Sequence, residues 1–144
     1  MNQILVAVDG SKHSVKVADE AVTVAKYMGA KILLLYVCQD TAVPEGFVEF
    51  AKLENVSLSD YYALVGDRVL SKIGARIKER GIEFEEISGV GIASEEILEV
   101  VRAREVSMIV VGMHGLHAIG RLRALGSTAR RVIEDSPVPV VVVP

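Results

Sequence analysis

Cysteine and tryptophan are scarce in this chain of 144 residues, which has one cysteine and no tryptophan. The single cysteine, Cys38, excludes an intrachain disulfide framework and a cysteine-based metal cluster, and it is consistent with a reducing compartment. No apolar run reaches membrane-spanning length, and no charged region precedes the short apolar run near Met1 as it would in a signal peptide. We therefore expect a cytoplasmic protein that has no membrane partner.

A strong excess of charge is also missing, because 16 lysines and arginines face 19 acidic residues, for a net charge of −3. Nucleic-acid-binding chains carry a basic excess, so we expect no nucleic-acid partner. Hydrophobic residues make up 51% of the chain and charged residues 24%, an ordinary profile for a globular domain. The length suits one domain, and no repeat or linker interrupts it, so we expect a single domain over residues 1–144.

Short apolar runs alternate with segments of helical periodicity along the chain. The runs predict five strands, at residues 3–8, 31–37, 82–87, 107–111 and 138–143. The periodic segments predict four helices, at residues 13–28, 59–80, 94 onward and 127–135. Ser94 is the expected N-cap of the third helix, and the partial alternation at 82–87 is typical of a half-exposed edge strand. This order predicts an α/β fold: a three-layer α/β/α sandwich around a five-stranded parallel sheet.

Residues 112–128, GMHGLHAIGRLRALGST, form a glycine-rich, cationic segment without a carboxylate. Gly112 and Gly115 would let the backbone approach a ligand closely. Gly126-Ser127-Thr128 opens a helix and offers free N–H groups, two hydroxyls and the positive end of a helix dipole. This combination favours phosphate binding. The alternative is a loop whose glycines only form turns and whose arginines are solvated.

Ligands of such sheets bind beyond the carboxyl ends of the strands, where the strand order reverses. Asp9, the pair Val37-Cys38 and the glycine-rich segment all follow predicted strands. No Gly-Lys-Ser/Thr is present, so the segment is not a Walker A loop, and its glycine spacing is too wide for a dinucleotide fingerprint. Asp9 could instead cap the turn that it forms with Gly10 and Ser11.

Three features in order resemble the universal stress protein family of the ATP-binding type. They are ILVAVDGS, then G-x-x-G followed by a spacer and G-[ST] (VVGMHG … GST), then the closing SPVPVVVV. The resemblance covers essentially the whole chain and implies a Rossmann-like, adenine nucleotide alpha hydrolase-like fold with strand order 3-2-1-4-5. One difference is that ten residues, Leu116 to Leu125, separate Gly115 from Gly126, against nine in the family.

The same resemblance implies an ATP-binding stress-response protein that acts as a switch or sensor, with little or slow hydrolysis and no catalytic residues. Its cofactor would be ATP with Mg²⁺, or with Mn²⁺, and no protein side chains would form a metal site of their own. Asp9 would contact the ribose or the metal–phosphate region, and the backbone of Ala7 and of Val37 would hydrogen-bond the adenine. The remaining nucleotide-binding residues would be Val111, Gly112, His114, Gly115, Gly126, Ser127 and Thr128.

Three sets of residues allow more than one interpretation of their role. His114 and His117 lack a third ligand nearby, so a phosphate or ribose donor is favoured over a metal site for His114. Arg121 and Arg123 could reach a γ-phosphate or could stay solvated. Cys38 is favoured as a packing residue over a redox group.

The last predicted strand, 138–143, is apolar and would lie at an edge of the sheet, which predicts a homodimer through this strand. The resemblance implies the same dimer. A second interpretation is a dimeric interaction module of the same family that does not bind nucleotide, which the ten-residue spacer favours. Asp9-Gly10-Ser11-Lys12-His13 is a poor match to the phosphate loop of nucleotidyl transferases, and residues 85–89 lack the phosphoacceptor aspartate of a receiver domain.

Overall fold

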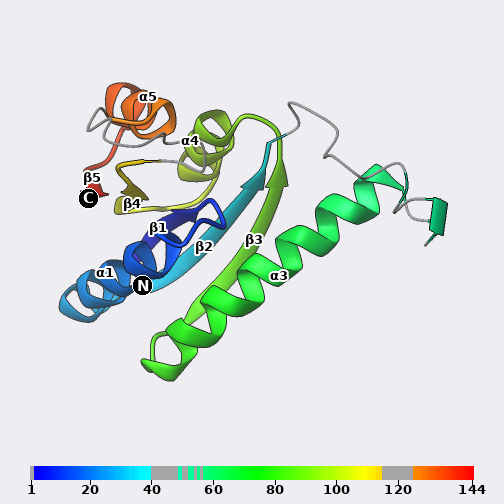
Figure 1. Ribbon diagram of the computed structural model, residues 1–144. Coiled ribbons are helices and arrows are strands. Elements are labelled where there is room, and N and C mark those ends of the chain that lie inside the picture. Colours follow the sequence, from blue (N-terminus) through cyan, green and yellow to red (C-terminus); the bar gives the residue numbers. More distant parts are fainter. Residues whose placement is uncertain (1, 40–48, 50–51, 54, 56, 115–124) are drawn as a thin grey trace.

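The computed structural model describes residues 2–39, 49, 52–53, 55, 57–114 and 125–144. One parallel sheet runs through it in the order β3-β2-β1-β4-β5 (Figure 1). The strands are β1 (Gln3–Val8), β2 (Lys31–Cys38), β3 (Phe84–Val90), β4 (Met108–Gly112) and β5 (Val140–Val143). The helices are α1 (Ser14–Met28), α3 (Leu58–Glu79), α4 (Ala93–Ala103) and α5 (Ser127–Asp135). The predicted α/β class, parallel sheet and strand order are confirmed.

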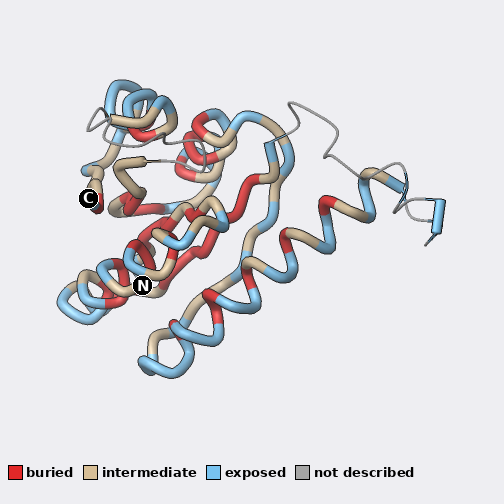
Figure 2. Tube along the Cα trace, in the orientation of Figure 1, coloured by how far each residue is buried: buried red, intermediate tan, exposed pale blue. Residues whose placement is uncertain are grey.

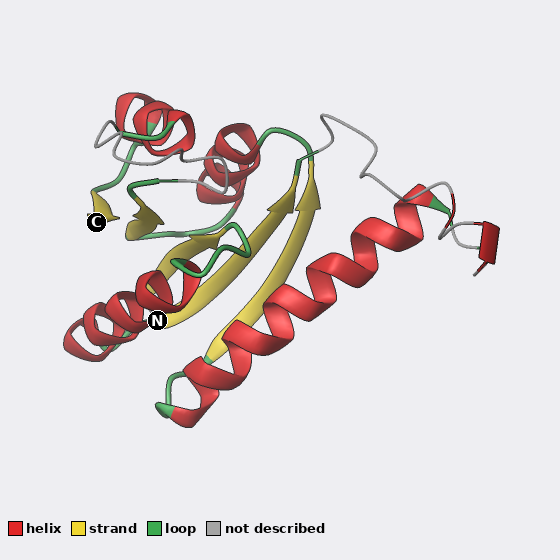
Figure 3. Ribbon diagram, in the orientation of Figure 1, coloured by secondary structure: helices red, strands yellow, loops and turns green. Residues whose placement is uncertain are grey.

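Helices cover both faces of the sheet, with α1 and α3 on one face and α4 and α5 on the other (Figure 3). Successive residues of β1 alternate between the two cores, so Ile4 and Val6 pack toward α1 and α3 while Leu5 packs toward α4 and α5. All three side chains are fully buried, as the colouring of the central strands in Figure 2 indicates. This two-sided burial explains why β1 and β2 are nearly continuous apolar runs in the sequence.

The starts of α3 and α4 each lie one residue before the predicted positions, and only the predicted N-cap of α4 is wrong. Ser57 caps α3: its hydroxyl accepts from the Asp60 N–H at 3.1 Å, and the Asp60 carboxylate accepts from the Ser57 N–H at 3.4 Å. Ser94 does not cap α4, because the helix begins directly after the turn at Gly91, whose φ of +140° suits glycine. Ile92 is the N-cap residue, and Ser94 is the second residue of the helix.

Strand boundaries differ from prediction mainly at the two edges of the sheet. β3 begins two residues later than predicted and continues to Val90, while the expected half-exposed pattern of an edge strand is confirmed. β5 begins at Val140 because Pro137 and Pro139 have no N–H to donate to a ladder. The edge position of β5 is confirmed.

The central strands bring distant parts of the chain together at one edge. β1 pairs with β2 on one side and with β4 on the other, so Val6 lies between Leu34 and Val110. All strands are parallel, and their carboxyl ends therefore meet at the same edge of the sheet. The helices change faces between β1 and β4, which makes this the expected ligand-binding point.

Candidate functional site

A cavity of about 300 Å³ lies between α4 and α5, where both helices begin. We call it the α4–α5 cavity. It contains amide, hydroxyl and guanidinium groups beside apolar side chains, and no carboxylate lines it among the described residues. Its lining residues are Gln39, Ile92, Ala93, Ser94, Ser127, Thr128 and Arg131. Two of the predicted binding residues, Ser127 and Thr128, therefore line the same cavity.

Both helices present free backbone donors at this point. The N-cap residues are Ile92 for α4 and Gly126 for α5, and neither supplies a side-chain cap. The first helical bonds run from the Glu96 N–H to the Ile92 carbonyl at 3.0 Å and from the Arg130 N–H to the Gly126 carbonyl at 2.9 Å. The N–H groups just before Glu96 and Arg130 therefore have no acceptor within their helices, which favours an anion.

The beginning of α5 is fixed to the end of β4. The Gly126 N–H donates to the Met113 carbonyl at 2.8 Å, and the Met113 N–H donates to the Val143 carbonyl at 2.8 Å. These bonds place Gly126 beside the end of the sheet. Gly115 and the rest of the spacer to residue 124, with His117, Gly120, Arg121 and Arg123, lie outside the described residues.

Asp9 forms the turn between β1 and α1. Its Oδ1 accepts from the Ser11 N–H at 2.9 Å and from the Ser14 hydroxyl at 3.1 Å. Ser14 in turn accepts from the N–H of Gly10, whose φ is +81°. The turn-capping role considered for Asp9 is therefore present. Both bonds use Oδ1, and within the described part of the chain no hydrogen bond reaches Oδ2.

Gly112 is explained by packing inside the protein. A Cβ at this position would lie 3.1 Å from His13 Cδ2 and 3.3 Å from Val17 Cγ2, so the absence of a side chain lets α1 approach β4. His13 Nε2 also lies 2.9 Å from the Val143 carbonyl, which joins α1 to the end of β5. His114 is half-buried just beyond this contact.

The other predicted residues lie in the core beside the α4–α5 cavity. Val37 and Val111 are buried in the core formed with α4 and α5, and Ala7 is half-buried against it. All three therefore share the face of the sheet on which the cavity opens. Asp9 and Gly112 instead contact α1, so the predicted residues divide between the two faces at the strand ends.

Tyr36 lies at the same end of the sheet but on the α1–α3 face. Burial is the main cause that raises its pKa to about 12, and the neighbouring Cys38, which is also hydrogen-bonded to it, and Asp9 add to the effect. The Tyr36 phenol stays neutral at physiological pH, and Cys38 is already hydrogen-bonded to it. We therefore interpret both side chains as packing residues and not as reactive groups.

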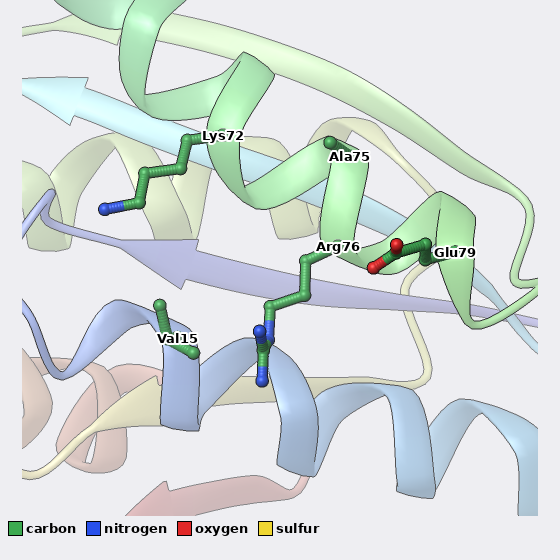
Figure 4. A pocket seen from close by; sticks show the side chains of 5 residues that line it. All are labelled: Val15, Lys72, Ala75, Arg76 and Glu79. Atoms are coloured by element: carbon green, nitrogen blue, oxygen red, sulfur yellow. The ribbon is translucent and has the colours of Figure 1, made fainter.

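A second hollow, of about 390 Å³, lies between α1 and α3. Figure 4 shows Val15 of α1 facing Lys72, Arg76 and Glu79 of α3 across it. Arg76 binds the Asp19 carboxylate through Nε at 2.7 Å and through its terminal nitrogen at 2.8 Å. This pair lowers the pKa of Asp19, chiefly through the Arg76 hydrogen bond. The hollow is larger than the α4–α5 cavity, but the carboxylate of Glu79 lines it. The α4–α5 cavity has no carboxylate among its described lining residues and lies where two helices begin, so we place the site there.

Sequence reasoning missed five lining residues of the α4–α5 cavity. It considered the ends of the first, second and fourth strands but omitted the end of β3, from which α4 begins. The sequence did signal this helix start through the acidic pair Glu95-Glu96, and a helix start at a strand end is itself a candidate anion site. The missed residues are Gln39, Ile92, Ala93, Ser94 and Arg131.

The described part of the chain has no metal cluster and no membrane-spanning helix. No group of three or more His, Cys, Asp or Glu side chains in this part of the chain is arranged to hold a metal ion. None of the described helices combines the length and the apolar character that crossing a membrane requires.

Comparison with known proteins gives a consistent result. Residues 1–144 match the model of the Universal stress protein family. The chain is 31% identical to the universal stress protein YxiE of Bacillus subtilis, over 99% of this chain and 98% of that protein. Among solved structures, it resembles the universal stress protein UspA from Lactobacillus plantarum, with a TM-score of 0.80, 25% identity and coverage of 99% and 97%. It also resembles a universal stress protein in complex with cAMP, with a TM-score of 0.72, 25% identity and coverage of 99% and 97%.

Proposed function

The chain belongs to the universal stress protein family, and from this premise we propose that it is a stress-response protein that binds an adenine nucleotide and acts as a switch or sensor. The proposed ligand is ATP with Mg²⁺ or Mn²⁺. The observation that carries the proposal is the α4–α5 cavity, where two uncapped helix N-termini meet at the carboxyl edge of the sheet. The similar universal stress protein that was solved with cAMP supports an adenine nucleotide as the ligand class.

The donors and the charges around the cavity fit the phosphate end of such a ligand. Ser127 and Thr128 supply hydroxyls, the helix starts supply N–H groups, and Arg131 supplies a cation. The adenine would lie toward Val37 and Ala7, which share this face of the sheet.

Asp9 suits the metal or the ribose rather than a phosphate. A carboxylate repels phosphate but accepts hydrogen bonds from ribose hydroxyls and coordinates Mg²⁺. Its Oδ1 is held by the turn, which leaves Oδ2 for this role. Mg²⁺ would neutralise phosphate charge when bound. No carboxylate or histidine among the described residues lines the cavity to activate water, so we propose little or slow hydrolysis.

Calorimetric titration tests the proposal directly. We expect saturable binding of ATP in the presence of Mg²⁺, and mass spectrometry of denatured, freshly purified protein should detect released adenine nucleotide. Parallel titrations with AMP and cAMP identify the preferred nucleotide. Absence of saturable binding for all three at millimolar concentration would refute the nucleotide proposal.

A second candidate function is a dimeric interaction module that does not bind nucleotide. The ten-residue spacer from Leu116 to Leu125 favours it, since it is one residue longer than the pattern of the nucleotide-binding type. In either case we propose a homodimer through the edge strand β5, and a cytoplasmic location. Nucleotide that remains with the purified protein would argue against this second function.

A further inference from the structure

The N-terminal turn of α4 contributes to the wall of the α4–α5 cavity in the same way as that of α5. Ala93 and Ser94 are the first two residues of α4, and Ser127 and Thr128 are the first two of α5. All four line the cavity. Equivalent positions of two helices therefore face one space, and an anion in that space can accept N–H hydrogen bonds from both.

Ser94 adds an independent indication of a ligand. The residue is only 7% exposed, yet no hydrogen bond to its hydroxyl is formed within the described part of the chain. Among the described residues, every side-chain oxygen or nitrogen that is fully shielded from solvent has a hydrogen-bond partner. The unpartnered Ser94 hydroxyl is therefore not fully shielded, and it is accessible from the cavity that Ser94 lines. Because largely buried polar groups are nearly always hydrogen-bonded, to protein or to ordered water, the Ser94 hydroxyl is available to bind a molecule in the cavity.

The charges around the two helix starts favour an anion. Arg131 lines the cavity, although its Nε also pairs with Asp135 one turn further along α5, whereas the two acidic residues in the first turn of α4 do not line it. Glu95 is exposed. The Glu96 carboxylate lies against β3 and the turn after it, with oxygens 3.2 Å and 3.4 Å from the positions that a Cβ would take at Gly89 and Gly91. The acidic side chains of α4 therefore do not fill the space between the helices.

We propose that a phosphate group binds between the N-terminal turns of α4 and α5, and that Ser94 donates a hydrogen bond to it. The phosphate belongs either to a bound nucleotide or to free inorganic phosphate. The first source rests on the proposed function and adds Ser94 to its phosphate contacts. The second does not depend on it, because the donors of both helices and Ser94 recognise the phosphate alone.

Amide NMR of the full-length, ¹⁵N-labelled chain tests this geometry with two probes, inorganic phosphate and AMP. We expect at least one probe to shift the amide signals of residues 93–95 and of residues 127–129 together, with one shared dissociation constant. If inorganic phosphate shifts both groups of amide signals while no nucleotide binds, the inference holds and the proposed function fails. If the probes move only the signals of residues 127–129, or neither set, the inference is refuted.

Variants at Ser94 test the hydroxyl itself. Ser94→Ala should weaken binding of the responding probe about tenfold, the effect of losing one hydrogen bond to a charged group. Ser94→Thr keeps the hydroxyl and should stay within about threefold of the parent. Ser94→Asp places a carboxylate between the helix starts, so it should abolish phosphate binding while it raises the thermal midpoint.

Ser71→Ala, an exposed position on α3, serves as the matched control and should leave binding unchanged. If Ser94→Ala binds AMP as tightly as the parent does, Ser94 is not a ligand, although the nucleotide site on α5 would stand. If Ser94→Asp still binds phosphate at the parent affinity, no phosphate lies between the two helices.

Discussion

Gly126 donates its backbone N–H to the carbonyl of Met113, and this bond of 2.8 Å fixes the first turn of α5 to the end of β4. The two residues bracket the glycine-rich segment whose length differs from the family pattern. Because both ends are held, the position of Ser127 is set by this contact. Loop-closure entropy changes very little with one residue in such a length, so if the chain binds nucleotide as proposed, the extra residue should have little effect on affinity.

Substitutions at Gly126 test this contact. Its φ of −61° is open to alanine and to proline, but only proline removes the N–H that binds Met113. We expect Gly126→Pro to destabilise the fold by about 1 kcal/mol and to weaken nucleotide binding, and Gly126→Ala to do neither. Urea unfolding and calorimetry measure both effects. Equal behaviour of the two variants would show that the hydrogen bond does not position the helix.

Asp9 should have separable structural and ligand roles. Asp9→Ala removes both hydrogen bonds to Oδ1 and should cost about 1–2 kcal/mol of unfolding free energy. Asp9→Asn keeps an acceptor for Ser11 and Ser14, so its stability should stay close to the parent. The lost charge should weaken ATP binding in the presence of Mg²⁺ more than in its absence. An Asn variant with unchanged affinity for Mg²⁺–ATP would limit Asp9 to the turn.

Gly112 should tolerate no side chain. Gly112→Ala would place a Cβ against His13 and Val17, which are held by the packing of α1, and should destabilise the protein by about 1–3 kcal/mol. Gly89→Ala is the matched control, because the nearest atom there is the movable carboxylate of Glu96 at 3.2 Å. Chemical denaturation compares the two. A neutral Gly112→Ala would show that α1 can shift away from β4 at little cost.

Glu85 should link stability to pH in acid. Its carboxylate accepts from Arg104 at 2.7 Å and lies 3.3 Å from Lys31 Nζ, and these hydrogen bonds, Arg104 first, lower its pKa from 4.5 to about 2. A depressed pKa means that the stabilisation is present above about pH 4.5 and is lost as the pH falls toward 2. Arg104→Gln should raise the pKa of Glu85 and flatten stability across this window. Carboxyl ¹³C NMR measures the titration, and an unchanged pKa would contradict the assignment. Both side chains are substantially exposed, so the stability effect should be small.

The open edge of β5 should carry the proposed dimer. The carbonyls of Pro139 and Val143 accept from β4, so the alternation of a ladder turns the N–H of Val142 away from β4. Val142→Pro should therefore reduce dimer formation while it leaves the β4–β5 pairing intact, and Val142→Thr should keep the dimer. Analytical ultracentrifugation compares the variants. A parent protein that is monomeric at high concentration, or a Pro variant that dimerises like the parent, would refute pairing through this edge.

The sequence predicted the sheet well because burial on both faces leaves a strong signal. β1 is a continuous apolar run bounded by Asp9 and Gly10, and its limits could be read directly. The N-cap of α4 could not, since Ser94 has the chemistry of a cap while the geometry is set by the turn at Gly91. A positive φ at a glycine is permitted by the sequence but is not required by it.

The candidate site was predicted in part for a similar reason. Ser127 and Thr128 belong to a pattern that is continuous in the sequence, whereas Ser94 joins them only through the packing of α4 against α5. Gly112 shows a role that the sequence did not predict. The sequence predicted that this glycine approaches a ligand, and the structure shows that it also lets α1 approach β4. Such proximity depends on tertiary contacts that no local pattern encodes.

The pairing of β1 with β4 also governs when the cavity can exist during folding. Ile4 pairs with Met108, so the centre of the sheet closes only after more than a hundred residues have left the ribosome, and α5 and β5 must follow. Contacts of such wide sequence separation form late and slowly. Until then the half made of β1, α1 and β2 has one apolar face that α4 and α5 do not yet cover, and surfaces of this kind are where incomplete chains aggregate.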